Sequence, residues 1–171
     1  TKLKTTLLLA ILFIGKALNA QTLAVADFNT TGVHATPKIV AKLARLELVK
    51  TNKFVVMDES DMNETLSDSS LEDCFGKKCL IALGKELGVP AVISGSVDGL
   101  GDKIVITVKL IDVSSQTIKA SHFMEFDNQE AELQRMLGIT IGEMLEIPQD
   151  EEIKKRLAYN HEVIITNNVG K

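Results

Sequence analysis

The chain contains no tryptophan, one tyrosine and six phenylalanines among 171 residues. Proteins that bind single-stranded nucleic acid or carbohydrate commonly stack the ligand on aromatic side chains, so neither partner is expected. Positive charge is also scarce, because nineteen Lys and Arg stand against twenty-three Asp and Glu, giving a net charge of −4. Nucleic acids and anionic membrane surfaces both attract clustered cations. The charge balance therefore predicts a protein that binds neither.

Only one long apolar run is present, and it lies at the start of the sequence. It spans residues 7–14, follows Lys2 and Lys4, and precedes a small-residue cleavage site that ends at Ala20. This pattern predicts a signal peptide over residues 1–20 and a periplasmic protein, with a retained N-terminal anchor as the alternative because Lys16 interrupts the cleavage region. The run is far shorter than the ~20 apolar residues of a membrane-spanning helix. We expect no membrane span after cleavage, and no Cys follows the run to accept a lipid. Residues 21–171 keep sixteen cations and twenty-three anions, a formal charge of −7.

Catalytic motifs are missing as well. The sequence has no nucleophile elbow, no H-x-x-x-H pair and no Walker loop. Gly95, Gly99 and Gly101 do not have the G-x-G-x-x-G spacing and precede a strand pattern rather than a helix, so they are interpreted as turn glycines and not as a phosphate-binding loop. The sequence predicts no catalytic residue, no cofactor and no metal, and hence a protein that is not an enzyme.

Two groups of polar residues offer alternatives to that interpretation. The first is an acidic cluster that could serve acid–base catalysis or Ca²⁺ binding, although acids at a helix start more often complement the helix dipole; it comprises Asp58, Glu59, Asp61 and Glu64. The second is the scattered set of histidines, His34, His122 and His161. His122 shares an alternating pattern with Ile118 and Met124, which favours a histidine tolerated in the sheet over a metal ligand.

Cys74 and Cys79 are the only cysteines, in C-x4-C spacing. In an exported protein such a pair is most simply a disulfide, and closing a six-residue loop would stabilise the fold by roughly 2 kcal/mol. Free thiols and a metal site are the alternatives. Zinc requires four ligands, which the three scattered histidines are poorly placed to complete. A redox-active pair is more often C-x2-C.

The hydrophobic pattern along the chain predicts β-α-β-α-β-β-β-α. Strands are expected over residues 22–28, 53–58, 91–97, 104–113 and 117–126, and helices after Thr36-Pro37, after a cap at Ser60, over 77–87 and over 129–145. Residues 29–32 are expected to form a loop, and residues 99–103 a hairpin turn. The first of these helices is predicted by apolar residues that recur at helical spacing, namely Ile39, Val40, Leu43, Leu46 and either Leu48 or Val49. The order of elements predicts a three-layer α/β/α domain with a mixed sheet over residues 21–147. Residues 148–171 form a charged tail whose run 163–166 is either an edge strand or the start of a further unit.

The sequence resembles the curli-assembly CsgG superfamily and its relatives, the TolB amino-terminal-domain-like proteins and the LpoB-type activators. The resemblance covers residues 22–146 and rests most on two stretches, Gly84-Lys-Glu-Leu-Gly88 through Gly95-Ser96 and Leu110-Ile-Asp-Val113. It implies the anticodon-binding-like α/β/α fold, a five-stranded sheet of order 2-1-3-4-5 with the fourth strand antiparallel, and a periplasmic envelope role without catalysis.

The function expected from these observations is a protein-interaction or assembly module of the cell envelope, in biogenesis or secretion. A pore-type curli secretion component is the disfavoured alternative, because a lipid-acceptor Cys is missing and tight turns join the last strands; a carboxylate-based envelope hydrolase is the other. The partner is expected to be an envelope protein or a second copy of the chain. In the order 2-1-3-4-5 the strands 53–58 and 117–126 lie at the edges, where another strand can pair, and the run 163–166 is a candidate cover.

Overall fold

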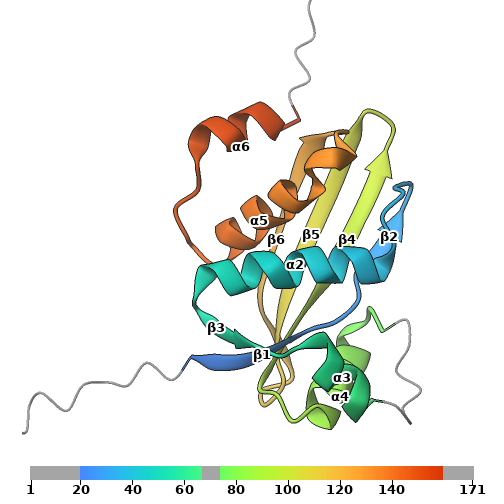
Figure 1. Cartoon of the computed structure of the whole chain (residues 1–171), viewed down its shortest axis with the longest axis vertical. Helices are drawn as coiled ribbons and strands as arrows, with labels where there is room; N and C mark the ends of the chain where they lie inside the picture. Colours follow the sequence, from blue (N-terminus) through green and yellow to red (C-terminus); the bar gives the residue numbers. More distant parts are fainter. Residues whose placement is uncertain (1–19, 67–73, 160–171) are drawn as a thin grey trace, which may run out of the picture.

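The computed structural model describes residues 20–66 and 74–159, which form an α/β domain around one mixed sheet (Figure 1). The five predicted strands are present as β1 (Gln21–Val25), β3 (Phe54–Val56), β4 (Ala91–Leu100), β5 (Lys103–Asp112) and β6 (Thr117–Asp127). Their order is β3-β1-β4-β5-β6, with β1 parallel to β3 and β4, and β5 antiparallel to both neighbours. The predicted fold class, strand order and antiparallel fourth strand are confirmed.

A sixth short strand lies where the sequence predicted a loop. β2 (Asn29–Thr31) pairs in parallel with the distal half of β4, after a break in which the backbone leaves β1. β4 is ten residues long, whereas β1 pairs with only its first three residues, from Ala91 to Ile93. Thr and Asn in β2 gave no apolar alternation, so the pairing could not be read from the sequence.

Two layers of helices cover the sheet. On one side lie α2 (Pro37–Thr51), η2 (Glu130–Glu132), α5 (Leu133–Met144) and α6 (Glu151–Leu157); on the other lie α3 (Glu59–Thr65) and α4 (Lys77–Glu86). We call these the α2 side and the α4 side. Figure 1 shows α2 and α5 lying next to each other across the strands, whereas α3 and α4 gather at the end of the sheet where β1 and β3 lie. Among the described residues, no helix is long and apolar enough to cross a membrane.

Each side of the sheet has its own buried cluster. The predicted alternation of β5 is confirmed, since Ile104, Ile106, Val108 and Leu110 all lie in the cluster on the α2 side. Ile118 departs from the face predicted for β6. Ala120 pairs with Leu110 but Ile118 pairs with Ile111, so the intervening residue forms a bulge that turns Ile118 to the α4 side.

Helix boundaries follow their caps. Thr36 caps α2 with Pro37 in the first turn, as predicted, but α3 is capped by Asp58, whose carboxylate accepts from the Ser60 N–H at 2.7 Å, and not by Ser60. Asp150 caps α6, a helix that the charged tail did not predict.

The chain beyond α6 returns to the sheet. Ala158 forms a bridge to Phe126 of β6, and Tyr159 N–H donates to the Glu125 carbonyl at 3.0 Å. The run 163–166 lies outside the described residues, as do the predicted signal peptide and His161.

Candidate functional site

The members of the acidic cluster have separate local surroundings. Asp58 caps α3, while Glu59 forms an ion pair with Arg45 of α2 at 3.3 Å. Asp61 and Glu64 are exposed on α3. No group of three or more His, Cys, Asp or Glu side chains that could hold a metal ion lies within residues 20–66 and 74–159. Asp58, Glu59 and Asp61 therefore lie where negative charge complements the start of α3, whereas Glu64 lies in its last turn.

The end of β1 beside β4 is where ligands commonly bind in open α/β sheets, but here it is closed by internal hydrogen bonds. The buried Ser94 hydroxyl donates to the Asp27 carbonyl at 2.7 Å, and Arg45 Nη2 donates to the Val25 carbonyl at 3.3 Å. Arg45 Nε is buried and has no hydrogen-bond partner within the described part of the chain. These bonds hold the backbone between β1 and β2 against β4 and α2.

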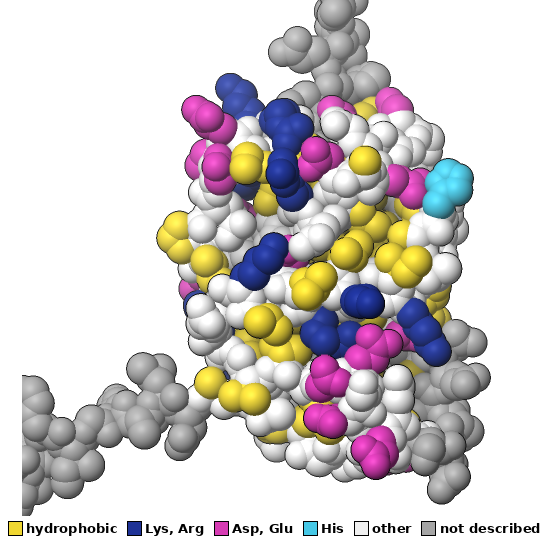
Figure 2. Space-filling view, viewed as in Figure 1, with side chains coloured by type: hydrophobic (Ala, Val, Ile, Leu, Met, Phe, Trp, Pro, Cys, Tyr) yellow, Lys and Arg dark blue, Asp and Glu magenta, His cyan; other side chains and the backbone are white. Residues whose placement is uncertain are grey.

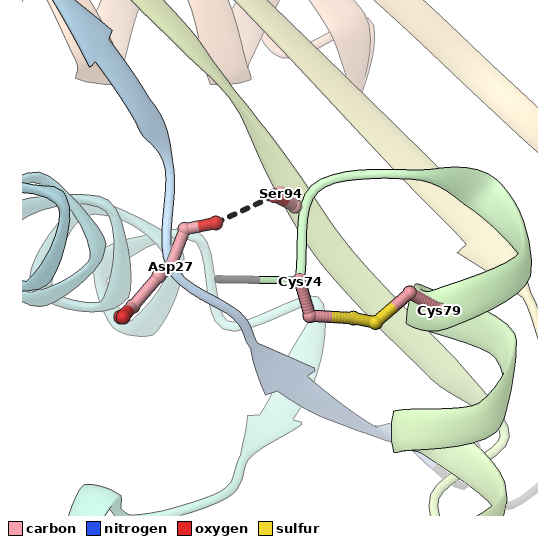
Figure 3. The surroundings of a disulfide bond; sticks show 4 residues. All are labelled: Asp27, Cys74, Cys79 and Ser94. Carbon is pink, nitrogen blue, oxygen red and sulfur yellow. Dashed lines mark hydrogen bonds between the residues drawn. A yellow bond between two sulfur atoms is a disulfide. The ribbon is translucent and has the colours of Figure 1, made fainter. Parts of the chain in front are cut away.

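Cys74 and Cys79 form a disulfide next to this junction (Figure 3). Their Cα atoms are 5.5 Å apart, and the bridge links the segment before α4 to the first turn of that helix. Cys74 is 5% exposed and packs with the apolar cluster on the α4 side. The disulfide therefore has a structural role, since it fixes the start of α4 over the sheet.

The glycines do not form a phosphate-binding loop, and only one of them lies in a turn. Gly101 has a φ of 72° in the two-residue β4–β5 turn, which suits glycine. Gly95 and Gly99 lie within β4, so their interpretation as turn glycines is wrong. A Cβ at Gly95 would collide with the Thr107 backbone of β5, and one at Gly99 would collide with Gly32. Both are small because the backbone packs closely there.

The two described histidines, His34 and His122, lie in different surroundings. His34 is exposed, and its backbone N–H and imidazole Nδ1 both contact the Glu130 carboxylate, at 2.9 and 3.1 Å. The backbone hydrogen bond from His34 is the main reason that the pKa of Glu130 is lowered. His122 is half-buried on β6. The structure brings neither histidine to a cysteine, and the single acid that contacts His34, Glu130, connects its loop to η2.

A shallow groove between α2 and the start of α5 is mainly polar, and its charges are matched within the chain. It is lined by Glu47, Lys50, Ala131, Glu132, Gln134 and Arg135. Glu47 accepts from Lys50 Nζ at 2.6 Å and from Gln134 Nε2 at 2.7 Å, and Glu132 pairs with Arg135 at 3.5 Å. The groove thus serves the packing of two helices and offers no unmatched charge for a ligand.

The outward surface of α2 is the clearest candidate for an interaction with another molecule. The residues that bury this helix are Val40, Ala41, Ala44 and Leu48. Ile39, Leu46 and Val49, whose spacing helped to predict the helix, are 50%, 48% and 54% exposed. Together with the exposed Lys38 and Lys42 they follow one another at helical spacing, and we call these five residues the α2 outer face.

This face carries no negative charge. Glu47 is the only acid in α2, and it points toward α5, with a side-chain exposure of 14%. Figure 2 shows apolar and basic side chains interspersed over α2, with acidic side chains gathered below them over α3. On a chain with a net charge of −4, the α2 outer face is a local surface of aliphatic and cationic groups. Sequence reasoning missed it because helical spacing alone did not separate its aliphatic residues from those of the buried side.

A second exposed surface, with apolar and small polar side chains, lies on the α4 side, where the sheet extends beyond α4. We call it the open sheet face, and it comprises Ser96, Leu100, Val105, Thr107, Ser121 and Phe123. Leu100 is 54% and Phe123 65% exposed, and no described helix packs on them. At its margin Lys103 forms an ion pair with Glu125 at 2.8 Å, and this pairing raises the pKa of Lys103. Lys103 Nζ also lies 5.5 Å from the centroid of the Tyr159 ring. The Tyr159 hydroxyl in turn bonds Asp102, which raises the tyrosine pKa.

The TolB amino-terminal domain model matches residues 9–118, nearly two-thirds of the chain. The chain belongs to the TolB amino-terminal domain family. This confirms the TolB part of the resemblance, while the wider resemblance to the CsgG superfamily stays a prediction. No curated protein sequence matches the chain.

Solved structures share the fold of this family member at low sequence identity. The LpoB C-terminal domain from Escherichia coli is similar with a TM-score of 0.55 and 16% identity, over 72% of this chain and 94% of that one. Lipoprotein GNA1162 from Neisseria meningitidis gives 0.52 and 14%, over 74% and 96%. TolB from Acinetobacter baumannii gives 0.50 and 16%, over 77% of this chain but only 30% of TolB. At these identities the likeness establishes the fold alone.

Proposed function

We propose that this protein is a non-enzymatic component of the periplasm that binds a partner protein of the cell envelope through the α2 outer face. The observation that carries the proposal is that Ile39, Leu46 and Val49 lie about half exposed beside Lys38 and Lys42, with no acid among them. The family and the signal-like N-terminus support the compartment. The names LpoB, TolB and lipoprotein GNA1162 support a place in the envelope.

The chemistry of the α2 outer face describes its partner. Exposed aliphatic side chains along one side of a helix fit an apolar groove or the apolar side of another helix. Lys38 and Lys42 lie one turn apart, so a partner with carboxylates bordering that apolar surface would match them. We therefore expect an acidic, amphipathic protein surface. An anionic membrane is disfavoured by the acidic side chains of α3 next to the same surface.

The two alternative functions have less support. A carboxylate-based hydrolase would need acids that are free to act, whereas Asp58 caps α3 and Glu59 pairs with Arg45. A curli secretion or outer-membrane assembly role is a narrower form of the proposed function. No side chain in the described part of the chain selects it over other envelope assemblies.

Site-specific photo-crosslinking in cells tests the proposal. A photoreactive residue at Leu46 should give an adduct with one envelope protein, and the same residue at Glu86, exposed on α4, is the matched control. The double variant Lys38→Glu and Lys42→Glu should reduce the Leu46 adduct at least tenfold, because it replaces attraction by repulsion. Both lysines are exposed, so the variant should melt as the native protein does.

Two outcomes would overturn the proposal. One is an adduct at Leu46 no stronger than that at Glu86. The other is an adduct whose yield is insensitive to charge reversal at Lys38 and Lys42, since the charges would then have no part in recognition.

A further inference from the structure

β6 is an edge strand, and only one end of its outer side is covered by described residues. Its inner side pairs with β5 along the whole strand. On the outer side Ala158 bridges to Phe126, and Tyr159 N–H donates to the Glu125 carbonyl at 3.0 Å. The returning chain thus occupies the strand from Glu125 to its end.

The backbone groups that remain available on β6 follow from that hydrogen bond. The Glu125 carbonyl points away from β5, and peptide groups alternate in direction along a strand. The N–H and C=O groups of Phe123 and Ser121 therefore point outward as well, and no described residue bonds to them. Such groups are able to pair with another strand.

The available part of the edge has two definite ends. At one end, Lys119 is the bulged residue between the pairs Ile118–Ile111 and Ala120–Leu110. Bulges interrupt regular pairing, and an edge lysine opposes it further. At the other end Glu125 is already occupied by Tyr159. Between these ends, residues 120–124 have no strand partner on their outer side among the described residues; we call them the window, and its centre is His122.

We propose that this window pairs antiparallel with the same window of a second copy of the chain, about a two-fold axis at His122. Two identical windows with these ends overlap fully only in that register. Ser121 and Phe123 then exchange backbone hydrogen bonds with Phe123 and Ser121 of the second copy. The proposal goes beyond the α2 outer face, since it concerns a different surface and a different partner.

The side chains of the window suit a second copy. Phe123, 65% exposed, lies opposite the small Ser121 of the second copy, and the two phenylalanines become diagonal neighbours on the open sheet face. The window is bounded by a cation at Lys119 and an anion at Glu125. Antiparallel pairing brings opposite charges together at both ends, whereas parallel pairing would bring like charges together. Only two residues per chain form hydrogen bonds across this interface, so the interface is small and the fraction of dimer depends on the protein concentration.

Engineered cysteines test the register directly. His122→Cys should crosslink to itself under mild oxidation, because residues of a non-hydrogen-bonded antiparallel pair have Cα atoms about 4.5 Å apart. Ala120→Cys and Met124→Cys should each stay uncrosslinked alone and crosslink when mixed, because Ala120 of one chain faces Met124 of the other. A self-crosslink of Ala120→Cys as strong as that of the mixture, or no crosslink at His122→Cys, would overturn the proposal.

Sedimentation of the purified protein gives a second readout that needs no new thiol. The apparent mass of the native protein should rise with concentration toward twice that of a single chain. Ser121→Pro removes the outward N–H, which an edge strand tolerates, and should stay at the mass of one chain; Ser121→Thr is the matched control and should dimerise. A native protein that stays monomeric at the crosslinking concentration contradicts the inference. No envelope partner is present in either experiment, so failure here leaves the α2 outer face untouched.

Discussion

The two sides of the sheet differ in the size and extent of their buried apolar clusters. On the α2 side, twenty-two described residues form one buried cluster that runs the length of β4, β5 and β6 under α2, α5 and α6. On the α4 side, twelve described residues form a smaller cluster beneath α3 and α4, confined to the end of the sheet near β1. Beyond that cluster, Leu100 and Phe123 are more than half exposed.

The difference suggests separate roles: the larger cluster stabilises the fold, and the exposed apolar surface is available for contact with another molecule. Burial of apolar surface is the main favourable contribution to folding, so the α2 side carries most of it. The α4 side retains a disulfide where its cluster is small, and an uncovered surface where there is no cluster. Apolar surface left outside a core commonly marks a contact with another molecule. The α2 outer face follows the same rule on the outside of the well-packed layer.

The largest expected effect comes from opening the core on the α2 side. Leu137→Ala should lower the free energy of unfolding by about 4 kcal/mol, because Leu137 is fully buried and the cavity left behind cannot collapse. Leu80→Ala, equally buried on the α4 side, should cost only about 2 to 3 kcal/mol, because its smaller cluster can relax toward the uncovered end.

Urea denaturation of the two alanine variants and the native protein measures both changes. Leu46→Ala, on the α2 outer face, is the matched control and should change the stability by less than about 1 kcal/mol. Equal losses for Leu137 and Leu80 would contradict the difference proposed between the two sides.

A smaller effect should follow from removing the disulfide on the α4 side. Cys74→Ser together with Cys79→Ser should lower the free energy of unfolding by about 2 kcal/mol, the value for a loop of six residues. Reductant should lower the melting temperature of the native protein and leave that of the double variant unchanged. Alkylation of both cysteines in the unreduced exported protein, detected by mass, would show that the bridge is not formed there.

Much of this fold could be predicted from the sequence, because elements such as β5 and α5 have a regular apolar pattern. The alternation of Ile104, Ile106 and Val108 predicted β5, and the helical spacing of Met136, Leu137 and Ile141 predicted α5. β2 and α6 were missed because their residues are mostly polar. Their positions depend on pairing with β4 and on packing against the α2-side cluster, which local patterns do not encode.

The candidate surface was missed for a more specific reason. α2 carries two apolar stripes side by side, and the larger residues lie on the outer one. Helical spacing grouped Ile39 and Leu46 with the buried Val40, yet the close approach of α2 to the sheet and α5 also buries the small Ala41 and Ala44. The position of Lys38 and Lys42 within the outer stripe was the available signal.

The smallest expected effect concerns the β5–β6 turn, which belongs to neither packed side. Asp112 accepts from the Ser115 backbone N–H at 2.9 Å and from the Ser114 hydroxyl at 2.7 Å. The backbone bond from Ser115, followed by the serine hydroxyls, lowers the pKa of Asp112 from 3.8 to about 2. A lowered pKa in the folded state means that the charged carboxylate stabilises the turn above pH 3.8, and that this contribution is lost as the pH falls through about 2.

NMR titration of the Asp112 carboxyl carbon should give a midpoint near 2, and Ser114→Ala should raise it toward 3.8. In urea denaturation, the deficit of Asp112→Asn relative to the native protein should be present at pH 5 and shrink toward pH 2, and added salt should reduce it because the group is exposed. A native midpoint at the ordinary 3.8, or a deficit that does not change with pH, would show that the turn does not hold the carboxylate as described.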